Sequence, residues 1–289
     1  MIVSHVTGGL GNQLAMWSFG KAYAERVNQP HYLDIASYES RGGDYKLHRY
    51  CLDRLSINPS IITAEKMEAA GIKLVLKETR LKYNPAIWDT ALGNVYLDMY
   101  CGDYRYSEPI IGKLREELTP MVPMEGEFAD LHDEMRDGET VSLHVRLQDY
   151  LRNPHCLVLP ISYYRDSLQL VARDRKNVRV YLFTDQKDIL IKYGFNVGLP
   201  FTIIDHGPER NIEDMTLMTA CKHHIVANSS YSFWGAWLDG KGGGITTVPD
   251  LYHDPMGKQI LKTYGEVIQP SYPKDWNVIP VKYQPRPAA

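Results

Sequence analysis

The stretch that decides the fold is Thr140–Tyr150, which reads TVSLHVRLQDY. Apolar and polar residues alternate up to Arg146, and this period of two predicts a β-strand that ends there. In an open α/β sheet, ligands bind beyond the carboxyl ends of the strands. An arginine at such an end places a planar, permanent cation where a phosphate or carboxylate can bind. A surface ion pair between Arg146 and Asp149 explains the same pattern equally well.

Bulk properties narrow the class of protein. At 289 residues, with 44% hydrophobic and 23% charged residues, the chain resembles a soluble globular protein with room for two domains. A net charge of −3 lacks the basic excess typical of nucleic-acid binding, so no nucleic-acid partner is expected. Four dispersed cysteines without C-x-x-C spacing argue against a zinc site or a disulfide scaffold. With no visible signal peptide or transmembrane segment, we expect a cytoplasmic location, and peripheral attachment to the inner membrane stays open.

A glycine-rich turn follows the first predicted strand, Ile2–Val6, and precedes a helix. This arrangement lets the backbone at a helix start approach a ligand, which makes Gly9 and Gly11 candidate binding residues. The turn matches neither G-x-G-x-x-G nor a P-loop, so dinucleotide and Walker-type sites are not indicated. The amides of Asn12 and Gln13 can either cap the helix or hydrogen-bond hydroxyls in a cleft. A connecting turn without a ligand is the alternative.

In the rest of the first half of the sequence, predicted strands and helices alternate less regularly. The further elements that it predicts are strands His31–Ile35 and Asn94–Met99 and helices Leu14–Arg26, Ala64–Ala70, Ile110–Leu118 and Phe128–Arg136. The polar segment Ser37–Asp53 is interpreted as a loop that faces the cleft. We place a domain boundary near Gly138, which gives domains 1–138 and 139–289.

The second half alternates strands with helices, which predicts parallel βαβ units and a Rossmann-like sheet. The predicted strands are Val141–Val145, Val178–Phe183, Phe201–Ile204, His224–Ala227 and Ile245–Val248. The predicted helices are Ser162–Arg173, Asp188–Tyr193, Glu213–Cys221 and Ser232–Leu238. Ser162 and Asn211 are candidate N-caps. The proline-rich tail beyond Tyr252 is expected to wrap the outside of the second domain.

The most distinctive run is HHIVANSSYSFWGAW, residues 223–237. A buried strand delivers four polar side chains to the start of a helix: Asn228, Ser229, Ser230 and Ser232. Hydroxyls and free N–H groups there form a seat for an anion, although helix capping accounts for one or two of the serines. The glycine and alanine of this helix allow close packing. Thr184 and Asp185 end another strand at the same predicted sheet edge, where spacing does not distinguish capping from ligand binding.

Three runs, GGLGNQLAMWSFGKAYA, HVRLQDY and ANSSYSFWGAWL, with DMTLMTACKHHI before the last, together resemble the bacterial α-1,2-fucosyltransferases of glycosyltransferase family 11. The similarity extends from Gly8 to about Trp276. It implies a GT-B-type α/β fold, with two Rossmann-like domains facing a cleft. Residues 1–138 would then form the acceptor-side domain and residues 139–289 the GDP-sugar-binding domain. The resemblance further implies inverting, metal-independent transfer of L-fucose from GDP-β-L-fucose to the 2-hydroxyl of a galactose, with no cofactor.

The family motif HxRRxD maps onto His144, Arg146 and Asp149, which the resemblance makes the catalytic candidates. The second arginine of that motif is Leu147 here, so any contact that it makes is not carried over. The resemblance also assigns donor binding to the serines of the last run, which are Ser229, Ser230 and Ser232.

The residues fit this chemistry, because negative charge develops on the leaving phosphate oxygen. Without a metal, fixed cations and N–H groups must stabilise that charge, and Arg146 and the Ser229–Ser230 helix start supply both. The sequence contains no Asp-x-Asp motif that would hold Mg²⁺ against a nucleotide sugar. Inversion needs at most one general base, and Asp34, Glu39 and Asp149 are candidates, each of which is as easily explained by a structural role.

Two other classes of function stay open. One is a transferase that uses a different GDP-linked deoxyhexose, such as colitose. The other is a non-catalytic protein that binds a glycan or a nucleotide with the same fold. The acceptor is also open between a galactoside-containing oligosaccharide and a lipid-linked glycan of O-antigen biosynthesis.

Overall fold

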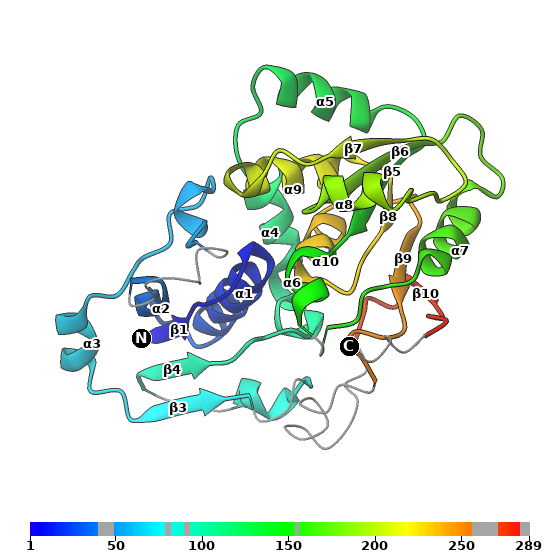
Figure 1. Ribbon diagram of the computed structural model, residues 1–289. Coiled ribbons are helices and arrows are strands. Elements are labelled where there is room, and N and C mark those ends of the chain that lie inside the picture. Colours follow the sequence, from blue (N-terminus) through cyan, green and yellow to red (C-terminus); the bar gives the residue numbers. More distant parts are fainter. Residues whose placement is uncertain (40–48, 79–81, 90–92, 154–155, 256–270, 284–289) are drawn as a thin grey trace. The chain divides into compact units, whose positions relative to one another are not determined.

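The structure, a computed structural model, describes residues 1–39, 49–78, 82–89, 93–153, 156–255 and 271–283. The chain forms two compact units, Met1–Val122 and Pro123–Ala289. Each unit contains one β-sheet in which every pair of neighbouring strands is parallel (Figure 1). The predicted α/β fold with parallel sheets is therefore confirmed.

Among its described residues, the first unit has four strands in the order β2-β1-β4-β3. They are β1 (Ile2–His5), β2 (His31–Asp34), β3 (Leu74–Lys77) and β4 (Val95–Asp98). Its α-helices are α1 (Leu10–Arg26), α2 (Ala36–Glu39), α3 (Ala64–Ala70) and α4 (Ile111–Leu118). The strand β3 was not predicted, and α1 begins at Leu10 rather than Leu14 because Gly9 is already its N-cap.

The part of the second unit that the structure describes has six strands in the order β10-β9-β8-β5-β6-β7. They are β5 (Thr140–Val145), β6 (Arg179–Thr184), β7 (Phe201–Ile204), β8 (His223–Ile225), β9 (Thr246–Pro249) and β10 (Asn277–Ile279). Its α-helices are α5 (Glu127–Arg136), α6 (Gln148–Arg152), α7 (Ile161–Ala172), α8 (Lys187–Lys192), α9 (Asn211–Ala220) and α10 (Ser230–Trp237). Neither α6 nor β10 was predicted.

This strand order is that of the Rossmann fold. Counted from β5, the strands lie in the order third, second, first, fourth, fifth, sixth, which in Figure 1 places β5 and β8 in the middle of the sheet. The direction of winding reverses between the first and fourth strands, here β5 and β8. Loops leaving the carboxyl ends of these two strands separate there and leave room for a ligand.

The sheet of the second unit is buried on both faces, as parallel sheets require. On one face, Tyr181 and Phe183 of β6 pack against α5 and α9. On the other face, Val180 and Leu182 of the same strand pack with residues of α7 and α8. Because alternate residues of a strand point to opposite faces, one strand contributes to both cores.

The helix α5 belongs to the second unit, although the boundary was expected after it, near Gly138. Phe128 and Met135 of α5 lie in the core of the second unit, together with Tyr181 and Phe183 of β6. The compact units therefore divide between residues 122 and 123. The acidic composition of α5 concealed this single apolar stripe.

Local details differ from four expectations. The helix α7 begins at Ile161 with Pro160 at its N-cap position, and Asn211 is the first residue of α9 rather than its cap. The tail does not only wrap the unit, because Asn277–Ile279 pairs with β9 as the edge strand β10. In the predicted loop 37–53, Ala36–Glu39 forms α2, and residues 40–48 lie outside the described residues.

Gly235 explains the close packing that was expected of the last helix. A Cβ atom at this position would lie 2.9 Å from the Cβ and Sδ atoms of Met218, on α9. We expect Gly235→Ala to lower the free energy of unfolding by about 1–3 kcal/mol, because the added methyl overpacks this interface. Urea unfolding measures the change.

Gly112 in α4 supplies the matched control, because a Cβ atom there would meet nothing within 4 Å. Gly112→Ala should be neutral or stabilising by up to about 1 kcal/mol, since alanine is the better helix former. Equal shifts in both variants would show that packing at Gly235 does not matter.

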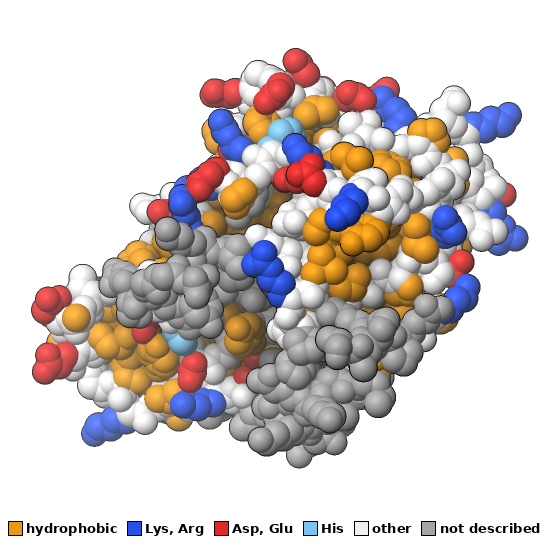
Figure 2. All heavy atoms as spheres, viewed as in Figure 1, with side chains coloured by type: hydrophobic (Ala, Val, Ile, Leu, Met, Phe, Trp, Pro, Cys, Tyr) orange, Lys and Arg blue, Asp and Glu red, His pale blue; other side chains and the backbone are white. Residues whose placement is uncertain are grey.

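Among the helices that the structure describes, none combines the length and the apolar character needed to cross a membrane. On the face seen in Figure 2, acidic and basic side chains of the described residues are interspersed and do not gather by sign.

Candidate functional site

The predicted phosphate-binding residues of the second unit lie at the point where the sheet reverses its winding. Arg146 directly follows β5, and Ser229 follows β8 at the N-cap position of α10. Ser142 and His224 are register partners on these two strands, so the loops that carry Arg146 and Ser229 leave adjacent strands. The topology thus brings together two motifs that are far apart in the sequence.

Arg146 is held between two carboxylates. Its Nη2 lies 2.8 Å from Oδ1 of Asp149, and its Nη1 lies 2.8 Å from Oδ2 of Asp185. The guanidinium also lies over the ring of Tyr150, 5.9 Å from its centroid. Only 19% of the Arg146 side chain is exposed. Burial opposes its charge, but Asp185 and Asp149 raise the pKa of Arg146 further, so the cation is permanent.

Asp185 organises the turn after β5. Its Oδ1 accepts hydrogen bonds from the backbone N–H groups of Leu147, at 3.0 Å, and Gln148, at 3.3 Å, where α6 begins. Thr184 acts as a cap, which was the alternative to ligand binding, since its Oγ1 accepts the N–H of Gln186 at 3.2 Å. The described contacts therefore give both residues a positioning role, and direct donor contact stays a prediction.

His144, the other catalytic candidate on β5, is 4% exposed. Its ring lies 5.5 Å from that of Tyr231, and its Nδ1 has no hydrogen-bond partner among the described residues. Burial, and secondarily the charge of Arg146, lowers the pKa of His144 to about 3. The imidazole is therefore neutral near pH 7 and can hydrogen-bond a ligand without adding charge.

Leu147, in the position of the second motif arginine, is 6% exposed and lies in the apolar core with Val145, Leu157 and Leu159. A charged side chain could not remain in this core without a large desolvation cost. Arg146 is therefore the cation of the motif that reaches the ligand edge in this chain.

The four polar residues of the loop after β8 differ in their contacts. Asn228 donates to the carbonyl oxygens of Leu157 and Tyr252 at 2.9 and 2.7 Å, so its amide holds the loop. Ser232 also holds the loop, since its Oγ accepts the N–H of Ala227 at 3.2 Å. Ser229 is 7% exposed, and its side chain makes no capping bond to α10. Ser230 is the first residue of that helix.

Tyr150 is a residue of the site that sequence reasoning missed. Its hydroxyl donates to the carbonyl oxygen of Asn228 at 2.6 Å and so ties the loop after β5 to the loop after β8. The signal that the sequence offered was its place directly after Asp149, at the end of the motif.

The glycine-rich turn of the first unit lies at the carboxyl end of β1. Gly9 has an extended backbone (φ −79°), and Gly11 and Asn12 lie in the first turn of α1. The position that needs a left-handed backbone is Gly8, with φ +78°. Gly9, Gly11 and Asn12, the residues predicted to bind the donor, therefore lie at the start of a helix, as expected for a βα turn.

Gln13 was predicted to reach the cleft, but it is fully buried. Its Nε2 donates to the carbonyl oxygens of Gly8, at 2.9 Å, and Arg49, at 2.7 Å. Its Oε1 accepts the N–H of Cys51 at 2.9 Å. Because both amide hydrogens and the oxygen are used, Gln13 joins the turn to the segment at residues 49–51 instead of facing a ligand.

The three candidate bases differ in their surroundings. Asp34 accepts hydrogen bonds from the N–H of Ala36, at 3.0 Å, and from the hydroxyl of Tyr96, at 2.6 Å. Asp149 pairs with Arg146, and the side chain of Glu39 lies outside the described residues. Asp34 and Asp149 are thus both engaged in holding the structure.

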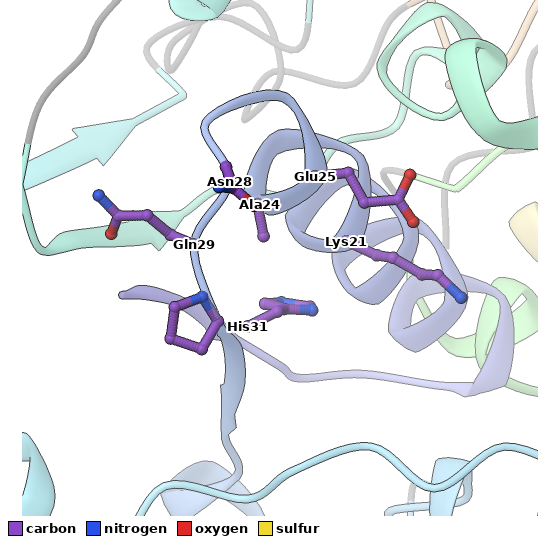
Figure 3. A pocket seen from close by; sticks show the side chains of 7 residues that line it. Lys21, Ala24, Glu25, Asn28, Gln29 and His31 are labelled. Carbon is purple, nitrogen blue, oxygen red and sulfur yellow. The ribbon is translucent and has the colours of Figure 1, made fainter.

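A pocket of about 440 Å³ lies elsewhere in the first unit, between the end of α1 and the start of β2 (Figure 3). The residues that line it are Lys21, Ala24, Glu25, Asn28, Gln29, Pro30 and His31. Lys21 pairs with Glu117, and Glu25 pairs with Lys113. This pocket lies at the amino ends of the strands, opposite the edge where α/β proteins bind ligands.

Comparisons with known proteins extend over most of the chain. An α-1,2-colitosyltransferase of Escherichia coli is 30% identical over 273 residues, which cover 86% of this chain and 91% of that protein. The O-antigen biosynthesis glycosyltransferase WbnK of E. coli is 25% identical, with 82% of this chain and 89% of that protein covered.

Solved structures are similar at lower identity. Fucosyltransferase NodZ from Bradyrhizobium aligns with a TM-score of 0.48 at 14% identity, covering 81% of this chain and 91% of NodZ. The E. coli heptosyltransferase WaaC, solved with ADP, aligns with a TM-score of 0.41 at 11% identity, covering 96% and 92%.

The family model of glycosyl transferase family 11 matches residues 94–279, well over half of the chain. This match spans β4 and the whole sheet of the second unit, including the Arg146 turn and the serines at the start of α10. The chain belongs to glycosyl transferase family 11.

Proposed function

We propose that this family 11 glycosyltransferase moves L-fucose from GDP-β-L-fucose to the 2-hydroxyl of a terminal galactose, with inversion and without a metal ion. The observation that carries the proposal is the position of Arg146, a permanent cation held by Asp149 and Asp185 at the point where the sheet reverses its winding. The family motifs in the sequence support the choice of donor and linkage.

The position of Arg146 is important for the leaving group of the reaction. As the glycosidic bond breaks, negative charge builds on the β-phosphate oxygen of GDP, and a preorganised cation stabilises it more than it stabilises the ground state. Guanidinium has five N–H donors, and the two carboxylates each approach one terminal nitrogen, so donors remain for a phosphate. Ser229 and the N-terminus of α10 add a hydroxyl and a positive dipole end.

A second donor has a specific observation in its favour, namely the 30% identity to an α-1,2-colitosyltransferase. Colitose lacks the 3-hydroxyl of fucose, so the two donors differ by one polar group. A site built to hydrogen-bond that hydroxyl rejects the deoxy analogue by about 10⁴–10⁵, whereas an apolar site rejects the hydroxyl by only about 10².

The test offers GDP-fucose and GDP-colitose separately with lactose and measures kcat/KM from GDP release, with product linkage determined by NMR. A preference for GDP-fucose with an α-1,2-linked product supports the proposal. A preference for GDP-colitose would mean that colitose is the transferred sugar, and the proposed linkage would stay unchanged. Binding of both donors without GDP release would show that the protein is a non-catalytic relative.

The acceptor is proposed to be a galactoside at the end of an oligosaccharide or of a lipid-linked glycan. The similarity to an O-antigen biosynthesis glycosyltransferase supports the second kind. Comparing kcat/KM for lactose with that for a lipid-linked repeat unit ending in galactose separates the two.

Turnover is expected to survive an excess of EDTA. The reason is that Arg146 and the start of α10 already provide the charge stabilisation that a metal supplies in other transferases. The measurement compares initial rates of GDP release with and without chelator. A rate that falls in EDTA and returns with Mg²⁺ or Mn²⁺ would contradict the metal-independent mechanism.

A further inference from the structure

Tyr150, the third residue of α6, contacts both halves of the candidate site in the second unit. The guanidinium of Arg146 lies over its ring, 5.9 Å from the centroid. Its hydroxyl donates a hydrogen bond of 2.6 Å to the carbonyl oxygen of Asn228, the residue before Ser229. Arg146 leaves β5 and Ser229 leads into α10, so one side chain joins the cation to the start of that helix.

The hydrogen bond from Tyr150 fixes a peptide unit. The accepting carbonyl belongs to the peptide bond between Asn228 and Ser229, and the N–H of Ser229 donates to the carbonyl oxygen of Ala227 at 2.8 Å. Because a peptide bond is planar, holding its carbonyl sets the direction in which the chain enters α10. An anion at a helix start binds to the first N–H groups of the helix, so this direction determines where the anion lies.

Asn228 is also held from its side chain. Its Nδ2 donates to the carbonyl oxygens of Leu157, at 2.9 Å, and Tyr252, at 2.7 Å. These carbonyls belong to the segments that follow α6 and β9. Loss of the Tyr150 hydroxyl would therefore leave the loop attached at two points and would release only the contact that connects it to the Arg146 turn.

Burial keeps the Tyr150 hydroxyl a hydrogen-bond donor. It raises the pKa of Tyr150 well above its ordinary value, and the neighbouring Tyr252 and Cys156 raise the pKa further. The charge of Arg146 acts in the opposite direction and does not outweigh burial. The phenol is therefore neutral near pH 7, and its bond to Asn228 is retained there.

We propose that Tyr150 is a positioning residue of the phosphate site, an inference that rests on the transferase function proposed above. Its hydroxyl fixes the spacing between Arg146 and the start of α10, so that the diphosphate of a nucleotide sugar contacts both together. Asp185 holds Arg146 from the end of β6, on the other side of β5 from β8, and Tyr150 supplies the link toward β8. Groups aligned in advance stabilise the leaving phosphate without reorganising as its charge develops.

The test removes the hydroxyl alone, because Tyr150→Phe keeps the ring beneath Arg146 and loses the bond to Asn228. We expect the Kd for GDP to rise about tenfold, the size that loss of one well-aligned hydrogen bond supports. The kcat with GDP-fucose should also fall, since the phosphate charge is greatest in the transition state. Calorimetric titration with GDP and rates of GDP release, both per folded molecule, measure the two effects.

Tyr163→Phe is the matched control, because it removes the same kind of hydrogen bond from the segment after β8. The Tyr163 hydroxyl donates to the carbonyl oxygen of Val226 at 2.5 Å, and the side chain is fully buried. Its melting temperature should fall at least as far as that of Tyr150→Phe, while its Kd for GDP and its kcat stay at the wild-type values. Equal losses of GDP affinity in the two variants would contradict a specific role for Tyr150.

A double-mutant cycle with Arg146→Ala distinguishes alignment from general loosening of the loop. If Tyr150 aligns Arg146 with α10, its hydroxyl matters only while the cation is present. Tyr150→Phe should then weaken GDP binding about tenfold in the wild-type background and less than about threefold in the Arg146→Ala background. The same cost in both backgrounds would overturn the proposal.

GDP binding also separates this inference from the proposed function. A Kd that rises in Tyr150→Phe but not in Tyr163→Phe supports the phosphate-site role, even if the wild type transfers a sugar other than fucose or none. An unchanged Kd and kcat in Tyr150→Phe would overturn the inference, while fucosyl transfer by the wild type would leave the function standing. A wild-type protein that binds no GDP would overturn both.

Discussion

Arg146→Ala is expected to lower kcat by about 10²–10³, or roughly 2.7–4 kcal/mol, because it removes a preorganised donor from the leaving phosphate. The same change leaves Asp149 and Asp185 facing each other without their cation. Stability should therefore also fall, by less than the roughly 3–5 kcal/mol for a fully buried pair, since Asp149 is 39% exposed. Steady-state kinetics with GDP-fucose and melting temperatures measure the two effects.

Arg146→Lys separates charge from geometry. Lysine keeps the cation between the two carboxylates but lacks the planar fork, so it should restore most of the stability and only part of the turnover. If Arg146 were merely a structural ion pair, lysine would restore both equally. A kcat/KM for Arg146→Ala within threefold of wild type would place the phosphate contact elsewhere.

Asp185→Ala is expected to lower kcat by about 10², although Asp185 need not touch the substrate. The carboxylate holds Arg146 and accepts two backbone N–H groups at the start of α6, so its loss frees the whole turn. A displacement of about 1 Å at a reacting centre costs a factor of this size. The unpaired N–H groups should also lower the free energy of unfolding by about 1–3 kcal/mol.

Asp185→Asn is the matched variant, because an amide oxygen can still accept the N–H groups of Leu147 and Gln148. We expect near wild-type stability and an intermediate kcat, since only the charge beside Arg146 is lost. If Asp185 acts by direct donor binding alone, both variants would raise the KM for GDP-fucose while their melting temperatures stay at the wild-type value.

The sequence allowed prediction of what depends on local pattern. The alternation of TVSLHV marked β5, and its charged end correctly located Arg146 at the carboxyl edge of the sheet. The short strand β3 and the edge strand β10 were missed because β3 has no buried position and two of the three residues of β10 are exposed. An exposed edge strand lacks the apolar alternation on which such prediction rests.

Side-chain partners were beyond reach because they depend on which strands become neighbours. Gln13 was assigned to the cleft from its place after a glycine turn, yet its partner Cys51 lies 38 residues away. Tyr150 was not considered, because its partner Asn228 lies 78 residues away. Parallel sheets make such separations the rule, since every crossover inserts a helix between paired strands.

The place of β5 in the middle of its sheet also has a consequence for how the second unit folds. Its residues Ser142 and His224 pair across 82 positions of chain, so a long loop must close before β5 gains its second neighbour. Topologies dominated by such non-local pairings fold slowly. During synthesis, one edge of β5 has no partner strand until β8 has emerged from the ribosome. The unpaired backbone groups on that edge of β5 make the nascent unit prone to aggregation. The yield of folded protein should therefore depend on chaperones and growth temperature.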